Sequence, residues 1–372
     1  MRLGIILFAA CFMATLTSGC WDVQMLKDDR IVYIVGLDLS SDGKLQSTIS
    51  ILDVSGGSDT GKKANSEILT ASGFTSRHTR DIIDHEVSGR LSASKLRVIL
   101  IGESLARQGI YPVLDVLYRD PRSALNARIA VVAGKAHDVI NKKITGSKLI
   151  GEHFNQLIRS AERRTVVPAV NIQQICPPML DPGDDFAVPY ISNKETNPTV
   201  YGIALFNGDK ITSTFNSEDS LLYLLMADKL AKNASLTLQV NKEENRNPEK
   251  FLAMDIQKLN RKMKVNVQGN RSIKVTLDLN LKVTATEYPK DHLNDRRTLG
   301  QLNKKLSEEL TRRAQAITQK MLQANHDGFG IGRRIMAYYP NTWNNLNWIE
   351  DYPKVEFDPK VTVEIVNHGI IN

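Results

Sequence analysis

The chain has 372 residues, of which 42% are hydrophobic and 6% aromatic, with 48 lysines and arginines against 41 aspartates and glutamates. This length suffices for two or three domains that each bury a core. The net charge of +7 is spread along the chain without a run of five like charges. This distribution argues against a nucleic-acid partner and suits a body that lies near anionic lipid headgroups.

The N-terminal segment predicts export. Arg2 precedes an apolar run from Leu3 to about Leu16, and the small residues 17–19 lead into Cys20. The run is about 14 residues long, whereas a membrane-spanning helix needs about 20, so residues 1–19 are predicted to be a signal peptide. A cysteine directly after small residues resembles the lipobox of bacterial lipoproteins, in which this thiol takes a diacylglycerol and becomes the mature N-terminus. The alternative is an ordinary cleaved signal peptide with an incidental cysteine.

Lipidation of Cys20 would anchor the chain without a transmembrane helix, because two or more acyl chains give stable membrane binding. Trp21 and Asp22 follow directly and would lie at the headgroup level, where tryptophan is favoured for its apolar body and polar N–H. The alternative is that Trp21 merely begins a linker.

Cysteine usage offers little chemistry beyond this anchor. Cys11 would leave with the signal peptide, so Cys176 would remain alone and could form no intramolecular disulfide. No group of cysteines and histidines has the spacing of zinc ligands. Cys176 precedes Pro177 and Pro178, a context that predicts an irregular loop and gives no support to a catalytic thiol.

The first part of the chain predicts strands and helices that alternate, but not as regular βαβ units. Strands are expected at 31–39, 45–54, 68–71, 95–101 and 127–133, and helices at 75–91, at 103–118 with an interruption near Gly109 and Pro112, and at 147–163. The next 35 residues hold six of the chain's 13 prolines and are predicted to be a connector. We therefore expect an N-terminal α+β domain over 20–195, with a possible small middle domain from about residue 147.

The second part, 196–372, predicts a C-terminal α+β domain. A hairpin is expected over 200–215 around Asn207 and Gly208, then a helix at 220–231, strands at 236–240, 251–257, 263–267, 273–285 and 361–366, and a long helix at 298–325. Apolar and polar residues alternate strictly from Ile273 to Ala285, which is typical of an antiparallel strand with one wet face. The predicted fold class is thus α+β and multi-domain, with mixed or antiparallel sheets and a C-terminal antiparallel sheet packed on one long helix.

Three motifs approach known chemistry, and each has a better explanation. Residues 56–63 resemble a phosphate-binding loop but lack the final Ser or Thr. His78, Asp81 and His85 could share a helix face as metal ligands, although the charged residues around them favour a solvated face. Residues 328–332 lack the spacing of a dinucleotide loop, and Asp327-Gly328 is expected to end the long helix in the left-handed region. The sequence predicts no enzyme, no metal and no cofactor.

Four segments in order along the chain resemble the C-subunit lipoproteins of bacterial spore germinant receptors, the Ger(x)C family. They are residues 19–22 with 31–38; residues 97–110 with 119–122; residues 202–206 with Asp209-Lys210; and Asp327-Gly328-Phe329-Gly330 with Pro340, Trp343, Trp348 and a terminal strand ending at Gly369. The resemblance implies a non-enzymatic subunit of a nutrient-sensing complex, with a membrane-embedded A subunit and a transporter-like B subunit as partners. It places the chain on the outer face of the spore inner membrane and implies three α+β domains in a row. Trp343 and Trp348 are expected in the core.

Three functions remain open on the sequence alone. The leading hypothesis is a lipid-anchored germinant receptor subunit that acts by protein–protein contact. The second is a solute-binding lipoprotein that captures a nutrient, which usually has two α/β lobes and is disfavoured by the one-wet-face strand 273–285. The third is a cell-envelope hydrolase, disfavoured by the lack of a nucleophile or metal motif.

Overall fold

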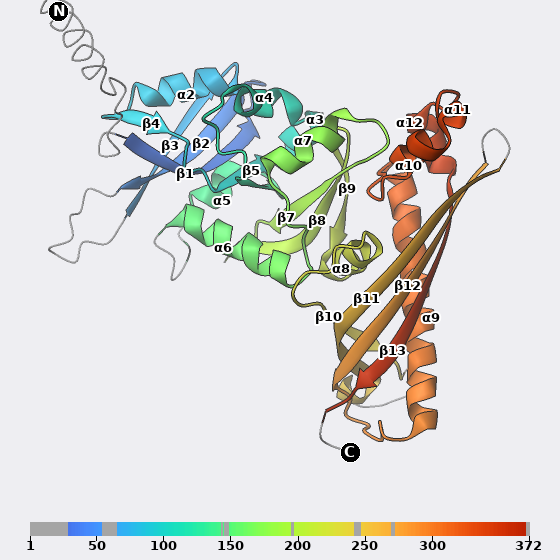
Figure 1. Cartoon of the computed structure of the whole chain (residues 1–372). Helices are drawn as coiled ribbons and strands as arrows, with labels where there is room; N and C mark the ends of the chain where they lie inside the picture. The colour runs from blue at the N-terminus through green and yellow to red at the C-terminus, as the bar shows by residue number, and fades with distance from the viewer. Residues whose placement is uncertain are drawn as a thin grey trace, which may run out of the picture.

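The computed structural model describes residues 29–53, 65–142, 144, 149–194, 197–241, 247–268 and 272–369, and these form two sheets, each with its own helices (Figure 1). The first sheet has nine strands in the order β3-β2-β1-β5-β6-β7-β8-β9, with β4 beside β1. These strands are β1 (Asp29–Leu39), β2 (Leu45–Asp53), β3 (Asn65–Gly73), β4 (Arg90–Ser92), β5 (Val98–Gly102), β6 (Arg128–Val132), β7 (Ala187–Ser192), β8 (Thr199–Asn207) and β9 (Lys210–Asn216). The central pairs β1-β5-β6-β7 and the short β1-β4 pair are parallel, and the pairs in β3-β2-β1 and β7-β8-β9 are antiparallel.

Helices cover both faces of this sheet. One apolar core lies under α2 (Ser76–Asp84), α3 (Glu103–Gln108), α4 (Tyr111–Arg119) and α7 (Ile172–Leu180), and a second lies under α5 (Ala136–Ile140) and α6 (Ile150–Arg163). In β5, Ile99 and Ile101 enter the first core, whereas Val98 and Leu100 enter the second. A strand buried on both faces needs an apolar residue at every position, which explains the continuous Val-Ile-Leu-Ile run.

A buried carboxylate joins β1 to α5. Asp38 accepts hydrogen bonds from the backbone N–H groups of Ala136 and His137, each at 2.8 Å, and so caps the first turn of α5. Gly102 at the end of β5 faces this carboxylate, and a Cβ there would collide with Asp38 Oδ1. Burial raises the pKa of Asp38, and the two backbone donors partly offset this. The position of α5 therefore depends on the lack of a side chain at residue 102.

The second sheet has the order β10-β11-β12-β13. It comprises β10 (Ser235–Gln239), β11 (Phe251–Gln268), β12 (Ser272–Glu287) and β13 (Glu356–Asn367), with η2 (Asn247–Lys250) before β11. One face packs on the long helix α9 (Arg296–Gln323), as Figure 1 shows. The odd-numbered residues of β12 from Ile273 to Ala285 are all buried, which confirms the predicted alternation. The predicted long helix is also confirmed, and its buried residues form one apolar stripe: Leu302, Leu306, Leu310, Ala314, Ile317 and Met321.

The last strand differs from the expected antiparallel arrangement. β13 runs parallel to β12, so the C-terminal sheet is mixed, and the chain crosses between the two strands through α9. The crossover continues through α10 (Ile331–Tyr338), α11 (Pro340–Trp343), α12 (Trp348–Asp351) and η3 (Tyr352–Lys354). Parallel neighbours cannot be joined by a tight turn and require such a connection.

Side chains of α9 cover the outer edge of β13. The backbone N–H groups of Val361, Val363 and Ile365 donate to Thr311 Oγ1, Ser307 Oγ and Asn303 Oδ1 at 3.0, 2.9 and 3.0 Å. The three acceptors on α9 are four residues apart, a rise of about 6 Å, and the three donors on β13 are two residues apart, an advance of about 6.6 Å. The two spacings therefore match over three successive hydrogen bonds.

A shared core unites the two sheets. In α8 (Ser217–Met226), every residue from Ser220 to Met226 is buried. Its apolar cluster includes Ile203 and Leu205 of the first sheet as well as the inner faces of β11, β12 and α9. The hairpin β8–β9, which we expected to open the C-terminal domain, pairs with β7 in the first sheet. Helix α6, assigned to a possible middle domain, packs on that sheet too. The boundary near residue 195 stays a prediction and falls between two paired strands.

The predicted α+β class is confirmed, while three local predictions are wrong. Helix α2 ends at Asp84 with His85 as its C-cap, not at residue 91, and the chain continues into β4. The proline-rich segment contains α7, which Asn171 and Gln174 start with a capping box. The strands expected at 251–257 and 263–267 are one strand, β11, with a register shift near Ile256.

The Gly102 contact can be tested with a matched pair of glycine substitutions. Gly102→Ala should lower the free energy of unfolding by about 2–3 kcal/mol, because the new methyl group overpacks the Asp38 carboxylate. Gly300→Ala, at an exposed position of α9 with no atom within 4 Å of the added Cβ, should raise it by up to about 1 kcal/mol. Urea unfolding followed by circular dichroism measures both. Equal effects of the two variants would contradict this role of Gly102.

Candidate functional site

The residues predicted for membrane anchoring lie outside the described part of the chain. This holds for Cys20, Trp21 and Asp22, and also for the loop at 56–63. Their roles stay predictions. The described chain begins at Asp29, in β1, nine residues after Cys20.

The other candidate residues do not assemble into a catalytic or metal site. Asp81 pairs with Arg77 at 3.0 Å, and the ring of His78 stacks on Phe74 with a centroid distance of 5.5 Å. Among the residues that the structure describes, no group of three or more His, Cys, Asp or Glu side chains could hold a metal ion. Cys176 is half-buried within α7 and not in the expected loop, because the capping box at Asn171 outweighs the two following prolines.

The glycine-rich segment after α9 has a different role from the one expected. Asn325, with φ of 50°, takes the left-handed conformation that ends α9, and Gly330, with φ of 64°, precedes α10. The prediction that Asp327-Gly328 would end α9 in the left-handed conformation is wrong. Asparagine also tolerates this conformation, and Asn325 takes it two residues earlier. The carboxylate of Asp327 instead accepts from the N–H groups of Ile331 and Gly332, each at 2.8 Å, and so caps α10.

Asp327 belongs to a buried polar cluster between the two sheets, which we call the aspartate junction; its members are Asp185, Tyr223, His326, Asp327, Trp348 and Tyr352. Asp185 Oδ2 accepts from the Asp327 N–H at 2.7 Å, and its Oδ1 accepts from the Gly208 N–H at 3.0 Å. Trp348 Nε1 donates to Asp327 Oδ2 at 3.2 Å. The junction thus ties the loop before β7 and the β8–β9 turn to the segment that follows α9. Trp348 is buried as expected, while Trp343 is half-buried against the same core.

His326 is held neutral in this junction. Its Nδ1 faces the carbonyl oxygen of Phe206, so it must carry the proton and donate, which leaves Nε2 to accept from the Tyr223 hydroxyl at 2.9 Å. Burial lowers the pKa of His326 to about 4. Burial also raises the pKa of Asp327 to about 8 and that of Asp185 to about 6, against the lowering effect of their backbone donors. Each polar atom named here has a hydrogen-bond partner, as is typical of a buried polar network that stabilises the fold.

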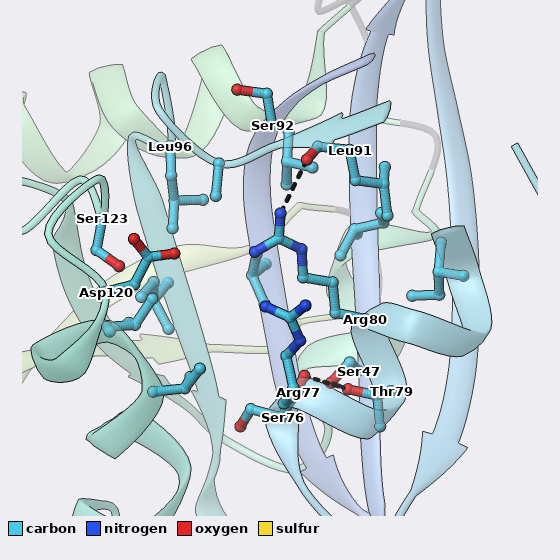
Figure 2. Close-up of a pocket in the computed structure, with 18 of the residues that line it drawn as sticks. Ser47, Ser76, Arg77, Thr79, Arg80, Leu91, Ser92, Leu96, Asp120 and Ser123 are labelled. Atoms are coloured by element: carbon cyan, nitrogen blue, oxygen red, sulfur yellow. Dashed lines mark hydrogen bonds between the residues drawn. The ribbon is translucent and has the colours of Figure 1, made fainter. Parts of the chain in front are cut away.

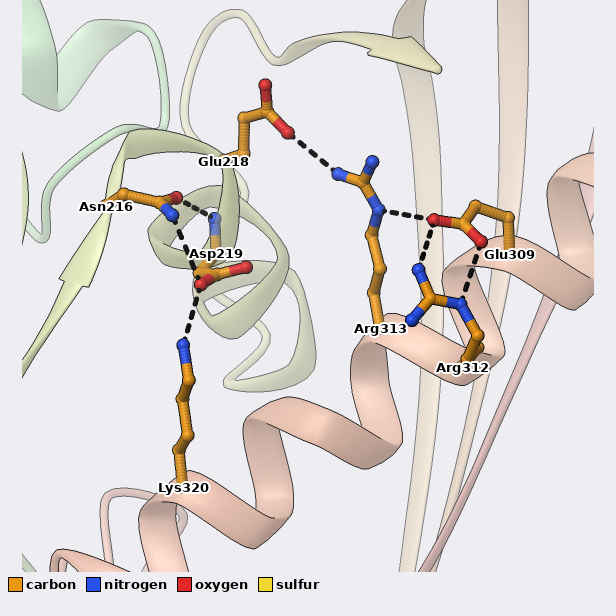
Figure 3. A network of polar contacts seen from close by, with 7 residues as sticks. All are labelled: Asn216, Glu218, Asp219, Glu309, Arg312, Arg313 and Lys320. Atoms are coloured by element: carbon orange, nitrogen blue, oxygen red, sulfur yellow. Dashed lines mark hydrogen bonds and ion pairs between the residues drawn. The ribbon is translucent and has the colours of Figure 1, made fainter. Parts of the chain in front are cut away.

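A second polar contact between the sheets lies on the surface, where α8 meets α9 (Figure 3). Arg313 bridges Glu218 of α8 and Glu309 of α9, with N–O distances of 2.8 Å to each. Arg312 also binds Glu309, and these two arginines lower the pKa of Glu309 to about 2. Lys320 pairs with Asp219 at 3.2 Å. Arg313 is the member that joins the two helices through two carboxylates.

A cavity of about 300 Å³ opens beneath α2, between β4, α4 and the strands β1 and β2 (Figure 2). Its interior is apolar, and arginine and serine side chains surround its opening. No pattern in the sequence indicates this cavity, because its walls come from six elements and their loops, spread from Asp29 to Ser123. The Asp327 segment of the junction was among the residues that carry the family resemblance, but its capping role was not predicted.

Comparisons with known proteins identify the family. A family model described as the spore germination protein N-terminal domain matches residues 22–193, and one described as spore germination B3/GerAC-like, C-terminal, matches residues 201–369. Together they cover nearly the whole chain, which therefore belongs to the GerAC family of spore germination proteins, as the sequence resemblance predicted.

Individual relatives agree with this assignment. The chain is 23% identical to spore germination protein GerQC of Bacillus cereus, over 95% of each chain. It is also 23% identical to spore germination protein KC of Bacillus subtilis (strain 168), over 95% of this chain and 93% of that one. The crystal structure of the GerBC protein superposes with a TM-score of 0.55 at 16% identity, covering 90% of this chain and 97% of that chain. This last likeness shows a shared fold.

The ion bridge of Arg313 predicts a graded pair of substitutions. Arg313→Met should lower the free energy of unfolding by about 1 kcal/mol, since it removes two partly buried contacts between α8 and α9. Arg312→Met, at a more exposed position with one partner, should lower it less than Arg313→Met does. The difference between the variants should shrink in 1 M salt, which screens surface charges. Denaturant unfolding at low and high salt measures this, and an equal loss in both variants would contradict the bridge.

The two aspartates of the junction contribute stability that falls as the pH rises from about 4 to 8, whereas His326, with its lowered pKa, contributes in the opposite direction between about pH 4 and 6.5. The pKa values of Asp185 and Asp327 in the folded state exceed the ordinary value of 3.8, so the folded chain keeps protons that the unfolded chain has released. Each such proton contributes a slope of up to about 1.4 kcal/mol per pH unit. Asp327→Asn and Asp185→Asn should flatten this slope, whatever their effect at a single pH.

Asp295→Asn is the matched control for these variants. Asp295 caps α9, and hydrogen bonds from Thr298 and Arg297 lower its pKa, so its substitution should leave the slope above pH 5 unchanged. Thermal midpoints measured at half-unit intervals from pH 5 to 8 provide the slopes. A junction variant whose slope equals that of the parent chain would overturn the assignment.

Proposed function

We propose that this chain is a lipid-anchored, non-catalytic subunit of a spore germinant receptor, acting by assembly with other receptor subunits. The observation that carries the proposal is the match of the two family models in series, over residues 22–193 and 201–369. Family membership supports a role in spore germination, and the relatives that match over 95% of this chain are named as spore germination proteins. The partners that the family implies are the A and B receptor subunits.

The proposed anchor is a diacylglyceryl group on Cys20, on the outer face of the spore inner membrane. The apolar run followed by small residues and a cysteine supports it. In the described part of the chain, no helix is long and apolar enough to span a membrane. Because an extended chain advances at most about 3.6 Å per residue, the nine residue steps from Cys20 to Asp29 would hold the start of β1 within about 32 Å of Cys20. Trp21 and Asp22 would then lie at the headgroups.

A non-catalytic role is supported by how the chemically versatile residues are used. Asp38 and Asp327 cap helices, His326 bridges a tyrosine and a carbonyl, and Asp81 pairs with an arginine. Asp38, His326 and Asp327 are buried, and their contacts account for this burial without a reaction. The shared core and the aspartate junction between the two sheets suit a subunit that presents fixed surfaces to its partners.

A second candidate function is favoured by one specific observation, the cavity beneath α2. A solute-binding lipoprotein that captures a nutrient needs a pocket of this kind. The two functions are compatible if the same subunit both assembles and binds a small molecule, and a ligand test of the cavity decides whether binding is one of them.

The anchor is tested by Cys20→Ala, with Cys176→Ala as a matched control. Cys20→Ala should move the protein from the membrane to the soluble fraction and reduce nutrient-triggered germination, because the acyl chains supply the membrane affinity. Cys176→Ala removes the half-buried cysteine of α7 and should leave both properties unchanged. Fractionation with immunoblotting and a germination assay measure the two effects. If the Cys20→Ala protein stays with membranes and supports germination, the anchor assignment fails.

A further inference from the structure

The cavity beneath α2 has the build of a binding site for a small molecule. Its volume of about 300 Å³ lies at the lower end of the range typical of ligand pockets. The interior is lined by buried aliphatic side chains, which include Val32, Leu37, Ile49, Ile83, Leu96 and Ile99. Such a surface offers an apolar body a place away from water.

The charged groups around the opening are predominantly cationic. Four arginines line the cavity, namely Arg77, Arg80, Arg90 and Arg122, against the two carboxylates of Asp29 and Asp120. Figure 2 shows the guanidinium groups of Arg77 and Arg80 one above the other, both extending from α2 across the cavity. Two like charges that face one space repel each other, and a bound anion would relieve that repulsion.

These arginines differ in how far their own contacts neutralise them. Arg80 donates to the carbonyl oxygen of Leu91 at 3.0 Å, which fixes the guanidinium without removing its charge. Arg77 has one carboxylate partner, Asp81, and Arg122 lies 3.9 Å from Asp120. Within the described ranges, Arg90 has neither an ion-pair nor a hydrogen-bond partner through its side chain. Arg80 is thus preorganised, and both Arg80 and Arg90 have no carboxylate partner within these ranges.

We propose that this cavity binds a small amphipathic anion, a molecule with one carboxylate or phosphate head and an apolar body. The head would lie between Arg77, Arg80 and Arg90, where guanidinium groups can give charge-assisted and bidentate hydrogen bonds. The apolar body would lie on the aliphatic interior. The proposal deepens the second candidate function and is independent of the anchor at Cys20 and of receptor assembly.

The test titrates the purified full-length protein with hexanoate. Hexanol, an uncharged ligand with the same number of carbon atoms, is titrated in parallel. Saturation-transfer NMR measures both dissociation constants. The protein is held in phosphatidylcholine vesicles if it fractionates with membranes, and in buffer if it does not. Fractionation therefore tests the anchor at Cys20, and ligand binding tests the cavity separately. Hexanoate should bind saturably and about tenfold more tightly than hexanol.

Two variants place the binding in this cavity. Arg77→Gln/Arg90→Gln should weaken hexanoate binding about tenfold and leave hexanol binding unchanged. Arg107→Gln, which removes an exposed arginine of α3 away from the cavity, should leave both unchanged. Ala93→Trp, at the wall of the cavity, should reduce binding of both ligands by filling the space. Thermal midpoints verify that each variant is folded.

The proposal is overturned if hexanoate does not bind saturably, if hexanol binds as tightly as hexanoate, or if the double arginine variant binds hexanoate like the parent chain. A final arm distinguishes two sources of the same chemistry. Displacement of hexanoate by vesicles that contain phosphatidylglycerol would identify a membrane lipid as the anion. Displacement by free carboxylates alone would identify a soluble metabolite.

Discussion

The burial of α8 between the two sheets is the constraint on which the rest of the structure depends. A helix with seven consecutive buried residues has no face for water and requires apolar partners on every side. The first sheet supplies β8 and β9, and the second supplies β11, β12 and α9. Neither sheet buries this helix alone, so the two sheets form one body. The aspartate junction and the Arg313 bridge add polar contacts between the same two sheets.

The sequence predicted most elements where a single period decides the structure. The alternation of β12 and the apolar stripe of α9 are clear signals in the sequence, because each element buries only one face in a core. Prediction failed where distant contacts decide. The parallel pairing of β13 with β12 depends on a crossover of more than sixty residues, and a strand pattern does not show its direction. Likewise, α7 forms despite Pro177 and Pro178, because a capping box begins it and the first core buries Ile172, Ile175 and Met179.

The residues that carried the family resemblance are largely structural. Gly102 leaves space for the Asp38 carboxylate, Asp209 accepts from the Tyr111 N–H at 3.3 Å, and Asp327 caps α10. Such residues cannot be exchanged freely, since each satisfies a buried donor or avoids a collision. They therefore identified the fold without marking a binding site. The cavity beneath α2 takes part of its wall from the same segments, for example Leu37, Ile99 and Arg122, but these residues meet those of the other elements only in the folded chain.

The cover that α9 provides for β13 has a consequence for how copies of this protein meet. A strand at the edge of a sheet presents unpaired N–H and carbonyl groups that can template pairing with another chain. At high local concentration such pairing between copies would lead to aggregation. Because Asn303, Ser307 and Thr311 already occupy the outward N–H groups of β13, a neighbouring chain would have to break three hydrogen bonds before it could add a strand there. The helix thus protects the solubility of the sheet as well as its core.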